Sequence, residues 1–357
     1  MLNHKTLRFL LPAILSIMLA MGGFNCNILG PHITSSPDTT SNNFSFQSWS
    51  FGASNAGGST LQDVAIISDS DIWAVGAIYL DSADGNPDPN AYNGLHWNGQ
   101  KWTNMRIPVP LCGSSSTQPF PLYSVFAFAS DDVWFTGGGD MEHWDGVTFT
   151  TDCSMNALIS GRVNKIGGTS STDIYIVGNA GTIVHYSDGS WQKIQSGTTL
   201  NFYDIYGSGG QIIAVASDPA DNYNRKIVQL NGTTATDVSD FPIPWPLSTV
   251  WFVPNEVYYV AGSGVWEKNK LSDSTWKDIS NVSQYYSTVV RGNSVNDVFI
   301  AGAYGEFLHW NGVRWYSFLP ETSLNSGAYG SMAVKGNLVV AVGQNEGKGV
   351  VLMGTRQ

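Results

Sequence analysis

A pattern that recurs from residue 61 to the C-terminus constrains the fold more than any other feature. In its clearest copy, residues 297–315, an aspartate opens an apolar run, a second apolar run ends in His309-Trp310, and an Asn-Gly turn leads to Trp315. Successive copies begin about 40 residues apart, after a longer first interval. A period of about 40–45 residues with several short strands per unit is typical of the blades of a β-propeller.

The copies also predict the number of blades and the form of each one. An Asn-Gly or Asp-Gly pair, the strongest short hairpin signal, separates the last two strands of a copy. The inner strands are apolar at consecutive positions, as expected of sheets packed on both faces. We therefore predict an all-β, seven-bladed propeller with four-stranded antiparallel blades. The seven leading runs begin at Asp71, Asp132, Asp173, Gln211, Glu256, Asp297 and Asn337.

The two ends of the repeat region predict how the ring closes. The last blade stops after a third strand at residues 350–354, and no fourth strand follows it. Residues 46–51 precede the first blade and have the composition of an unpaired outer strand. Pairing this N-terminal strand with the C-terminal blade would close the ring and remove exposed strand edges.

Residues 1–26 have the pattern of an export segment. His4, Lys5 and Arg8 precede an apolar run over residues 9–20, which is shorter than the ~20 residues that span a bilayer. Three fates stay open: acylation of Cys26 as in a lipoprotein, cleavage and secretion, or an uncleaved anchor. We expect an exported bacterial protein, in the cell envelope with a lipid anchor or extracellular. Residues 27–44 predict a flexible polar tether, and residues 45–357 the propeller.

Cys112 and Cys153 follow the last strands of the first and second blades, on the same side of the predicted ring. In an exported protein this placement predicts a disulfide between them. Cys26 then has no partner, which favours its acylation. The alternative is three unpaired thiols in an uncleaved cytosolic protein.

Net charge excludes some partners. The chain carries a net charge of -11 with 17 Lys plus Arg and no basic cluster. A nucleic-acid surface needs a positive stripe, so we expect no nucleic-acid partner. Contact with a membrane is expected only through the N-terminal anchor or lipid.

Histidine and aspartate recur at fixed repeat positions. Equivalent positions on different blades are related by the ring rotation, so these histidines cannot converge on one metal ion. We therefore expect no metal at them and a structural role beside the adjacent aromatic residue. For the repeated aspartates at positions 71, 132, 173 and 297 we expect turn chemistry, with the carboxylate accepting local backbone N–H groups. The four histidines are His96, His143, His185 and His309.

Departures from the repeat are the candidate binding loops, because loops on a rigid scaffold carry function. They are an insertion in the first blade at residues 77–93, one in the fourth at residues 217–225, and the linkers at residues 105–121 and 241–246. Aromatic and acidic side chains at one mouth of the ring would suit a sugar ligand. The acidic insertion could bind Ca²⁺, and a solvated acidic loop is the alternative. The candidate ligand-binding residues are Asp81, Asp84, Asp88, Asp218, Asp221, Tyr223, Arg225 and Trp245.

The Asp-Val-Trp-Ala-Val-Gly and His-Trp-Asn-Gly-x-x-Trp repeat resembles one found in bacterial exported propellers and propeller lipoproteins. More distantly, the chain is similar to photosystem II assembly-factor propellers and to the Asp-box and kelch groups. Residues 187–191 resemble an Asp-box, although Asp188 and Gly189 are adjacent here. The resemblance implies scaffolding or ligand binding. It transfers no functional residue, and the ligand set of copper-oxidase kelch relatives cannot be placed.

These observations predict a monomeric, non-enzymatic binding or scaffold module at the cell surface or in the envelope, with a protein or carbohydrate ligand. No catalytic residue and no cofactor other than the calcium alternative is assigned. The alternative function is a carbohydrate-active enzyme with its site at the channel mouth, which would need two carboxylates facing each other across a substrate.

Overall fold

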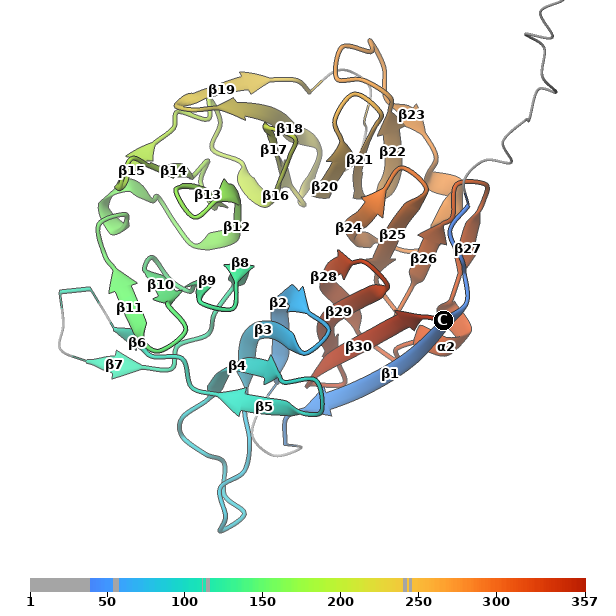
Figure 1. The fold of residues 1–357 in the computed structure, drawn as a ribbon. Coiled ribbons are helices and arrows are strands. Elements are labelled where there is room, and N and C mark those ends of the chain that lie inside the picture. The colour runs from blue at the N-terminus through green and yellow to red at the C-terminus, as the bar shows by residue number, and fades with distance from the viewer. Residues whose placement is uncertain (1–38, 54–57, 111, 114–115, 240–242, 244–245) are drawn as a thin grey trace, which may run out of the picture. The chain divides into compact units, whose positions relative to one another are not determined.

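The computed structural model describes residues 39–53, 58–110, 112–113, 116–239, 243 and 246–357. Residues 39–357 form one compact unit of seven four-stranded antiparallel sheets arranged as a ring (Figure 1). The seven-bladed propeller is confirmed. The export segment 1–26, Cys26, most of the tether 27–44 and Trp245 lie outside the described residues, as does the side chain of Tyr223. No helix in the described part of the chain is long and apolar enough to cross a membrane.

The first four blades each follow the chain order from the channel outward. The first blade contains β2 (Thr60–Ser68), β3 (Asp71–Ile78), β4 (Tyr92–Trp97) and β5 (Trp102–Met105), and the second contains β8 (Ser124–Ala129), β9 (Asp132–Thr136), β10 (Met141–Trp144) and β11 (Phe149–Asp152). The third contains β12 (Val163–Ser170), β13 (Asp173–Gly178), β14 (Ile183–Ser187) and β15 (Ser190–Lys193). The fourth contains β16 (Asn201–Ser208), β17 (Gln211–Asp218), β18 (Asp221–Asn231) and β19 (Thr234–Asp237).

The last three blades complete the ring. The fifth blade contains β20 (Leu247–Val253), β21 (Val257–Gly262), β22 (Gly264–Lys268) and β23 (Lys277–Asp278). The sixth contains β24 (Ser287–Ser294), β25 (Asp297–Gly302), β26 (Phe307–Trp310) and β27 (Trp315–Ser317). The seventh contains β28 (Ala328–Lys335), β29 (Leu338–Asn345), β30 (Lys348–Arg356) and β1 (Phe44–Phe51). The other elements are the hairpin β6 (Val109–Pro110) and β7 (Thr117–Gln118), the short helix α2 (Leu319–Thr322), and the 3₁₀ turns Asn156–Leu158 and Ser280–Val282.

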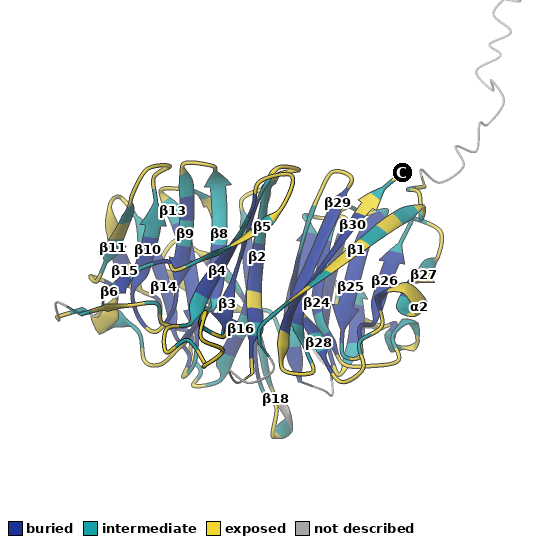
Figure 2. Cartoon of the chain, turned by 90° about the horizontal axis from the view of Figure 1, so that it is seen from below, coloured by how far each residue is buried: buried dark blue, intermediate teal, exposed yellow. Residues whose placement is uncertain are grey.

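The ring closes by the predicted pairing of the two ends. Strand β1 lies antiparallel along the whole of β30, with Phe44 opposite Arg356 and Phe51 opposite Gly349. Arg356 also forms an ion pair with Asp297 of the sixth blade. Figure 2 shows β1 crossing the outer side of the ring over β30. The seventh blade therefore draws its strands from both ends of the described unit, which leaves no blade incomplete.

Apolar side chains fill the spaces between neighbouring blades. Every residue of β21 and β25 is buried. Between the sixth and seventh blades, Phe299 and Phe307 pack with Tyr329 and Val339. Burial on both faces explains why the middle strands are apolar at consecutive positions rather than alternating.

Candidate functional site

The repeated histidine and aspartate form one structural unit in four blades. In each, the histidine Nε2 lies 2.7–2.9 Å from an aspartate oxygen of the same blade. The expected turn role of these aspartates is wrong, because their carboxylates meet a histidine on the neighbouring strand rather than local backbone N–H groups. The pairs are His96–Asp71, His143–Asp132, His185–Asp173 and His309–Asp297.

An aromatic ring completes each unit. It stands two residues after the aspartate and opposite the histidine, so the two rings stack across the strand pair, with centroids 4.0–4.3 Å apart. The stacked pairs are Trp73–His96, Trp134–His143, Tyr175–His185 and Phe299–His309. The repeat therefore encodes a brace between the second and third strands of a blade, and the four histidines stay in four separate blades.

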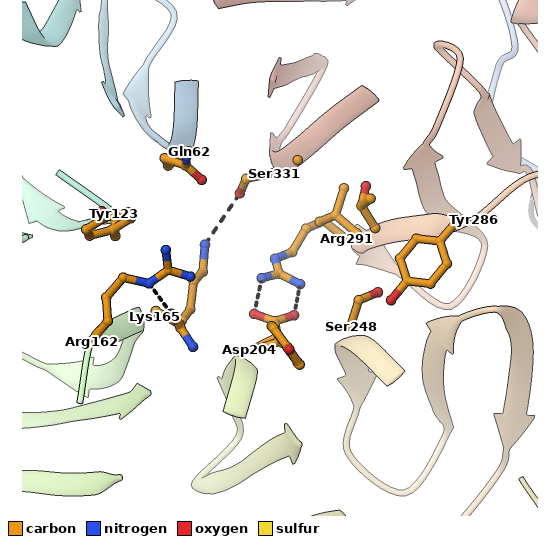
Figure 3. Close-up of a pocket in the computed structure, with 14 residues that line it drawn as sticks. Gln62, Tyr123, Arg162, Lys165, Asp204, Ser248, Tyr286, Arg291 and Ser331 are labelled. Atoms are coloured by element: carbon orange, nitrogen blue, oxygen red, sulfur yellow. Dashed lines mark hydrogen bonds and ion pairs between the residues drawn. The ribbon is translucent and has the colours of Figure 1, made fainter. Parts of the chain in front are cut away.

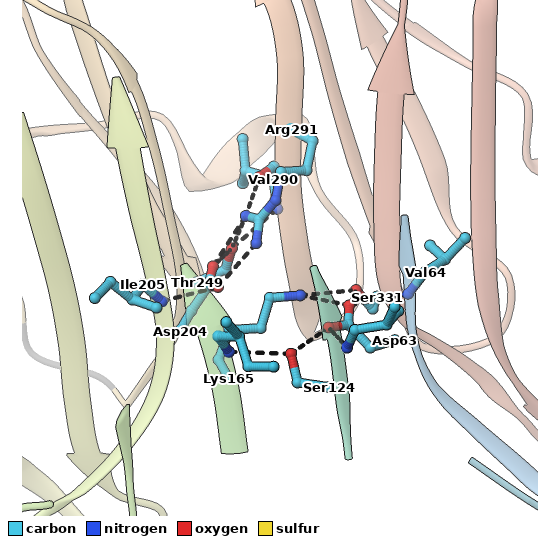
Figure 4. Close-up of polar contacts among 12 residues, drawn as sticks. Asp63, Val64, Ser124, Lys165, Asp204, Ile205, Thr249, Val290, Arg291 and Ser331 are labelled. Atoms are coloured by element: carbon cyan, nitrogen blue, oxygen red, sulfur yellow. Dashed lines mark hydrogen bonds and ion pairs between the residues drawn. The ribbon is translucent and has the colours of Figure 1, made fainter. Parts of the chain in front are cut away.

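The channel is crossed by polar side chains of the innermost strands, which we call the polar girdle: Asp63, Ser124, Lys165, Asp204, Thr249, Arg291 and Ser331 (Figure 4). Asp63 is fully buried. Its Oδ1 accepts from Lys165 Nζ and from Ser331 Oγ, at 2.7 Å for the latter. Its Oδ2 accepts from Ser124 Oγ at 2.5 Å and from the backbone N–H of Val125 at 3.0 Å. One carboxylate thus connects four blades.

A second carboxylate organises the other half of the channel. The guanidinium of Arg291 donates two hydrogen bonds to Asp204, from Nη2 to Oδ1 at 2.8 Å and from Nη1 to Oδ2 at 2.9 Å. Thr249 Oγ1 donates to the same carboxylate at 2.7 Å. Burial opposes ionisation of Asp204, but the Arg291 charge and these hydrogen bonds outweigh it and lower its pKa. Both girdle carboxylates are therefore matched by a cation.

The girdle divides the channel into two chambers that share Lys165 and Arg291 in their walls. The inner chamber, about 270 Å³, is lined mainly by apolar residues such as Val64, Ile166 and Met332. The outer chamber, about 310 Å³, is lined mainly by polar residues and receives a residue from the innermost strand, or from just before it, in every blade. We call this outer chamber the mouth cavity.

Tyrosines and one arginine define the mouth cavity (Figure 3). Tyr123, Tyr203 and Tyr286 line it together with Arg162. Arg162 Nε donates to Asn164 Oδ1 at 3.0 Å, and the guanidinium lies 4.5 Å from the centroid of the Tyr123 ring. Among the described residues no carboxylate contacts Arg162. The mouth cavity therefore offers one exposed positive charge beside aromatic surface, since the charges of Lys165 and Arg291 are already matched.

The candidate ligand-binding residues lie elsewhere. Asp81 and Asp84 stand in the excursion between β3 and β4, where Asp84 accepts from the Asn86 backbone N–H and side chain and its pKa is lowered by these bonds. Asp88 pairs with Arg106. None of them lines the mouth cavity. The calcium alternative stays a prediction.

In the fourth blade, the expected loop at residues 217–225 is mostly strand. β17 and β18 stay paired as far as Asp218 and Asp221, and Arg225 lies within β18 opposite Ser217. Asp218 accepts from the backbone N–H of Ala220 at 2.9 Å, and Asp221 accepts from Asn224 at 2.7 Å. These residues shape the hairpin tip and are also outside the mouth cavity.

Sequence reasoning overlooked the girdle and the mouth cavity. A signal was present: a polar residue occupies one aligned position of the first strand in every blade except the sixth, directly before an apolar residue. The candidates chosen from the sequence lie in loops that depart from the repeat, whereas this position lies within the repeat. Cys112 and Cys153, for which a disulfide was expected, form one in the structure, with their Cα atoms 5.7 Å apart.

Comparison with known proteins supports the fold and leaves the family open. No family model matches the chain, and no curated protein matches it. A structure described as YCF48 bound to D1 peptide is similar, with a TM-score of 0.64 and 17% identity over 90% of this chain and 99% of that one. YCF48 from Cyanidioschyzon merolae gives 0.59 and 13%, over 87% and 98%. The WD40 propeller domain of Doa1 gives 0.58 and 12%, over 88% and 97%.

Proposed function

We propose that this chain is a non-enzymatic, protein-binding propeller that holds an acidic segment of a partner in the mouth cavity. The observation that carries the proposal is Arg162, an exposed guanidinium at the cavity with no carboxylate partner among the described residues. A structural neighbour described as bound to a peptide supports the class of partner. Because the chain as a whole is acidic, with a net charge of -11, an isolated positive site would select where an acidic segment docks.

The chemistry of the cavity favours binding over catalysis. A glycoside hydrolase needs one carboxylic acid to donate a proton and one carboxylate to act as base or nucleophile. The two girdle carboxylates, Asp63 and Asp204, instead neutralise Lys165 and Arg291. Tyrosines around a charged group are typical of protein-recognition surfaces, because their rings supply contact area and their hydroxyls supply hydrogen bonds. We place the protein at the cell surface or in the envelope on the strength of its N-terminal pattern.

A display library of random peptides, selected on the purified wild-type protein, tests this function. We expect enrichment of peptides rich in Asp and Glu. An enriched peptide should bind Arg162→Gln at least about tenfold more weakly, because a hydrogen bond to a charged group contributes about 1.5–3 kcal/mol. Arg314→Gln, which changes an exposed arginine outside the cavity, is the control and should bind as wild type. Peptides that bind Arg162→Gln equally well would refute the site, and no enrichment would refute peptide binding.

A carbohydrate ligand is the second candidate, favoured by an exposed aromatic surface. The rings of Tyr285 and Tyr304 lie 5.0 Å apart and are 39% and 52% exposed. A shallow pocket beside them is lined by Tyr286, Ser263 and Gln284. A glycan array probed with wild type and with Tyr304→Ala tests this candidate: a hit lost in the variant supports it, and a blank array removes it.

A further inference from the structure

A second cluster of reactive side chains lies away from the channel, between the first and second blades. Cys112 belongs to the β6–β7 linker, Asp140 to the turn between β9 and β10, and Cys153 follows β11. One potential ligand atom from each residue lies within 4.8 Å of the other two. Three separate segments of chain thus converge on one point.

Two buried carboxyls lie at or beside the cluster, and no cation of the described chain pairs with either. Asp140 is 6% exposed, and its Oδ1 accepts one bond, from Asn156 Nδ2 at 3.2 Å. Glu142, two residues later in β10, is 1% exposed. Its Oε2 accepts from the Thr151 hydroxyl at 2.5 Å, while Oε1 is buried and has no hydrogen-bond partner.

No Lys, Arg or His of the described chain forms an ion pair with either carboxyl. Buried charges are normally paired or coordinate metals. The contrast with the channel is sharp, because both buried carboxylates there are matched by a cation.

We propose that reduction of the Cys112–Cys153 disulfide turns this cluster into a Zn²⁺ site, with ligands Cys112, Cys153 and Asp140 and a fourth position open to water. An external dithiol supplies two electrons and two protons. The S–S bond breaks, each cysteine becomes a thiol, and the dithiol becomes a disulfide. Zn²⁺ then displaces both thiol protons to solvent, since thiolates are the metal-binding form.

Ligand chemistry and geometry favour zinc. Thiolate ligands select soft or borderline ions over Ca²⁺ and Mg²⁺. Around a tetrahedral Zn²⁺ with bonds of about 2.3 Å to sulfur and about 2.0 Å to oxygen, ligand atoms lie roughly 3.3–3.8 Å apart. The three ligand atoms lie within 4.8 Å of one another, and the two sulfurs would move apart to this spacing once the disulfide is broken. The ion would also supply the positive charge that the two buried carboxyls lack. In the disulfide form no thiolate is available, so the site is controlled by redox state.

Titration of the full-length chain with Co²⁺ and Zn²⁺ tests the site, in a Cys26→Ser background that removes the remaining thiol. Co²⁺ is followed by thiolate-to-cobalt absorption in the near ultraviolet, and Zn²⁺ by competition with a chromophoric chelator. After reduction with a phosphine that is then removed, we expect one ion per chain, and none in the oxidised protein. Cys153→Ala, which replaces the more exposed of the two cysteines, should abolish tight binding while circular dichroism shows the β structure intact.

Asp140→Asn separates this site from simple binding by two thiolates. We expect it to weaken Zn²⁺ affinity at least tenfold, since even the outer partners of a metal site change affinity by about 10–100-fold. Asp145→Asn, which changes an exposed carboxylate in the same blade, is the control and should bind as the background protein does. The proposal is overturned if the reduced protein binds no more zinc than Cys153→Ala, or if Asp140→Asn binds zinc as tightly as the background protein.

Discussion

Removing the charge of Asp204 should destabilise the ring more than any surface substitution. Asp204 and Arg291 are 4% and 9% exposed and share two hydrogen bonds. Asp204→Asn keeps the size of the side chain but leaves the guanidinium buried without a counter-charge. Breaking a buried pair in this way costs about 3–5 kcal/mol of unfolding free energy. The Arg291 contacts with the carbonyl groups of Val250 and Val290 recover only part of it.

Urea unfolding followed by tryptophan fluorescence measures this loss. The double variant Asp204→Asn/Arg291→Met should recover at least half of it, because no charge then remains buried. Glu267→Gln is the matched control. It breaks the ion pair with Lys277, whose side chain is 72% exposed, and should cost less than about 1 kcal/mol. If Asp204→Asn costs no more than this control, or if the double variant is no more stable than the single one, the girdle does not hold the ring as argued.

Acid titration gives an independent check on the same pair. The pKa of Asp204 is lowered in the folded protein from 3.8, because the Arg291 charge and hydrogen bonds outweigh the opposing effect of burial. A carboxyl whose pKa is lower in the folded protein stabilises the fold at pH values above its unfolded pKa. This contribution is lost as the pH falls below about 4 toward the folded pKa. Wild type should lose this part of its stability on acidification, and Asp204→Asn should not.

Two further changes test other parts of the fold. Burial raises the pKa of Glu142 from 4.5 to about 7 in the folded protein. The contribution of this group to stability is therefore complete below pH 4.5, and up to about 3 kcal/mol is lost as the pH rises through 7. Glu142→Gln should remove this pH dependence in urea unfolding measured from pH 5 to 8. Deletion of residues 44–51 should expose the edge of β30 and the rings of Phe299, Phe307 and Phe318, which Phe44 and Phe46 cover. Light scattering after size exclusion should then show dimers or larger species, and a monomeric, folded deletion variant would contradict the closure argument.

The architecture could be predicted because the spacing between copies of the repeat is a local property of the sequence. Each copy of the repeat carries an apolar run, and four copies also carry the histidine–aspartate brace between their second and third strands. Closure followed from counting strands at the two ends, and β1 pairs with β30 as expected. The aspartate role was wrong because the partner, a histidine on the next strand, is 11 or more residues away in sequence. A turn bond is the nearest local option for an aspartate, and cross-strand pairing outcompeted it.

The mouth cavity could not be predicted in the same way, because charge compensation across a ring is not local. Ser331 and Asp63 are 268 positions apart and yet share a hydrogen bond. In the sequence, Arg162 and Lys165 are neighbouring cations of an acidic chain, and Arg291 lies far from both. In the folded ring all three residues line one cavity, where Lys165 and Arg291 each pair with an aspartate. Because Asp63 and Asp204 neutralise Lys165 and Arg291, Arg162 is the cavity cation that pairs with no carboxylate among the described residues. Under the proposed function, binding specificity would therefore depend on which charges the ring itself does not use.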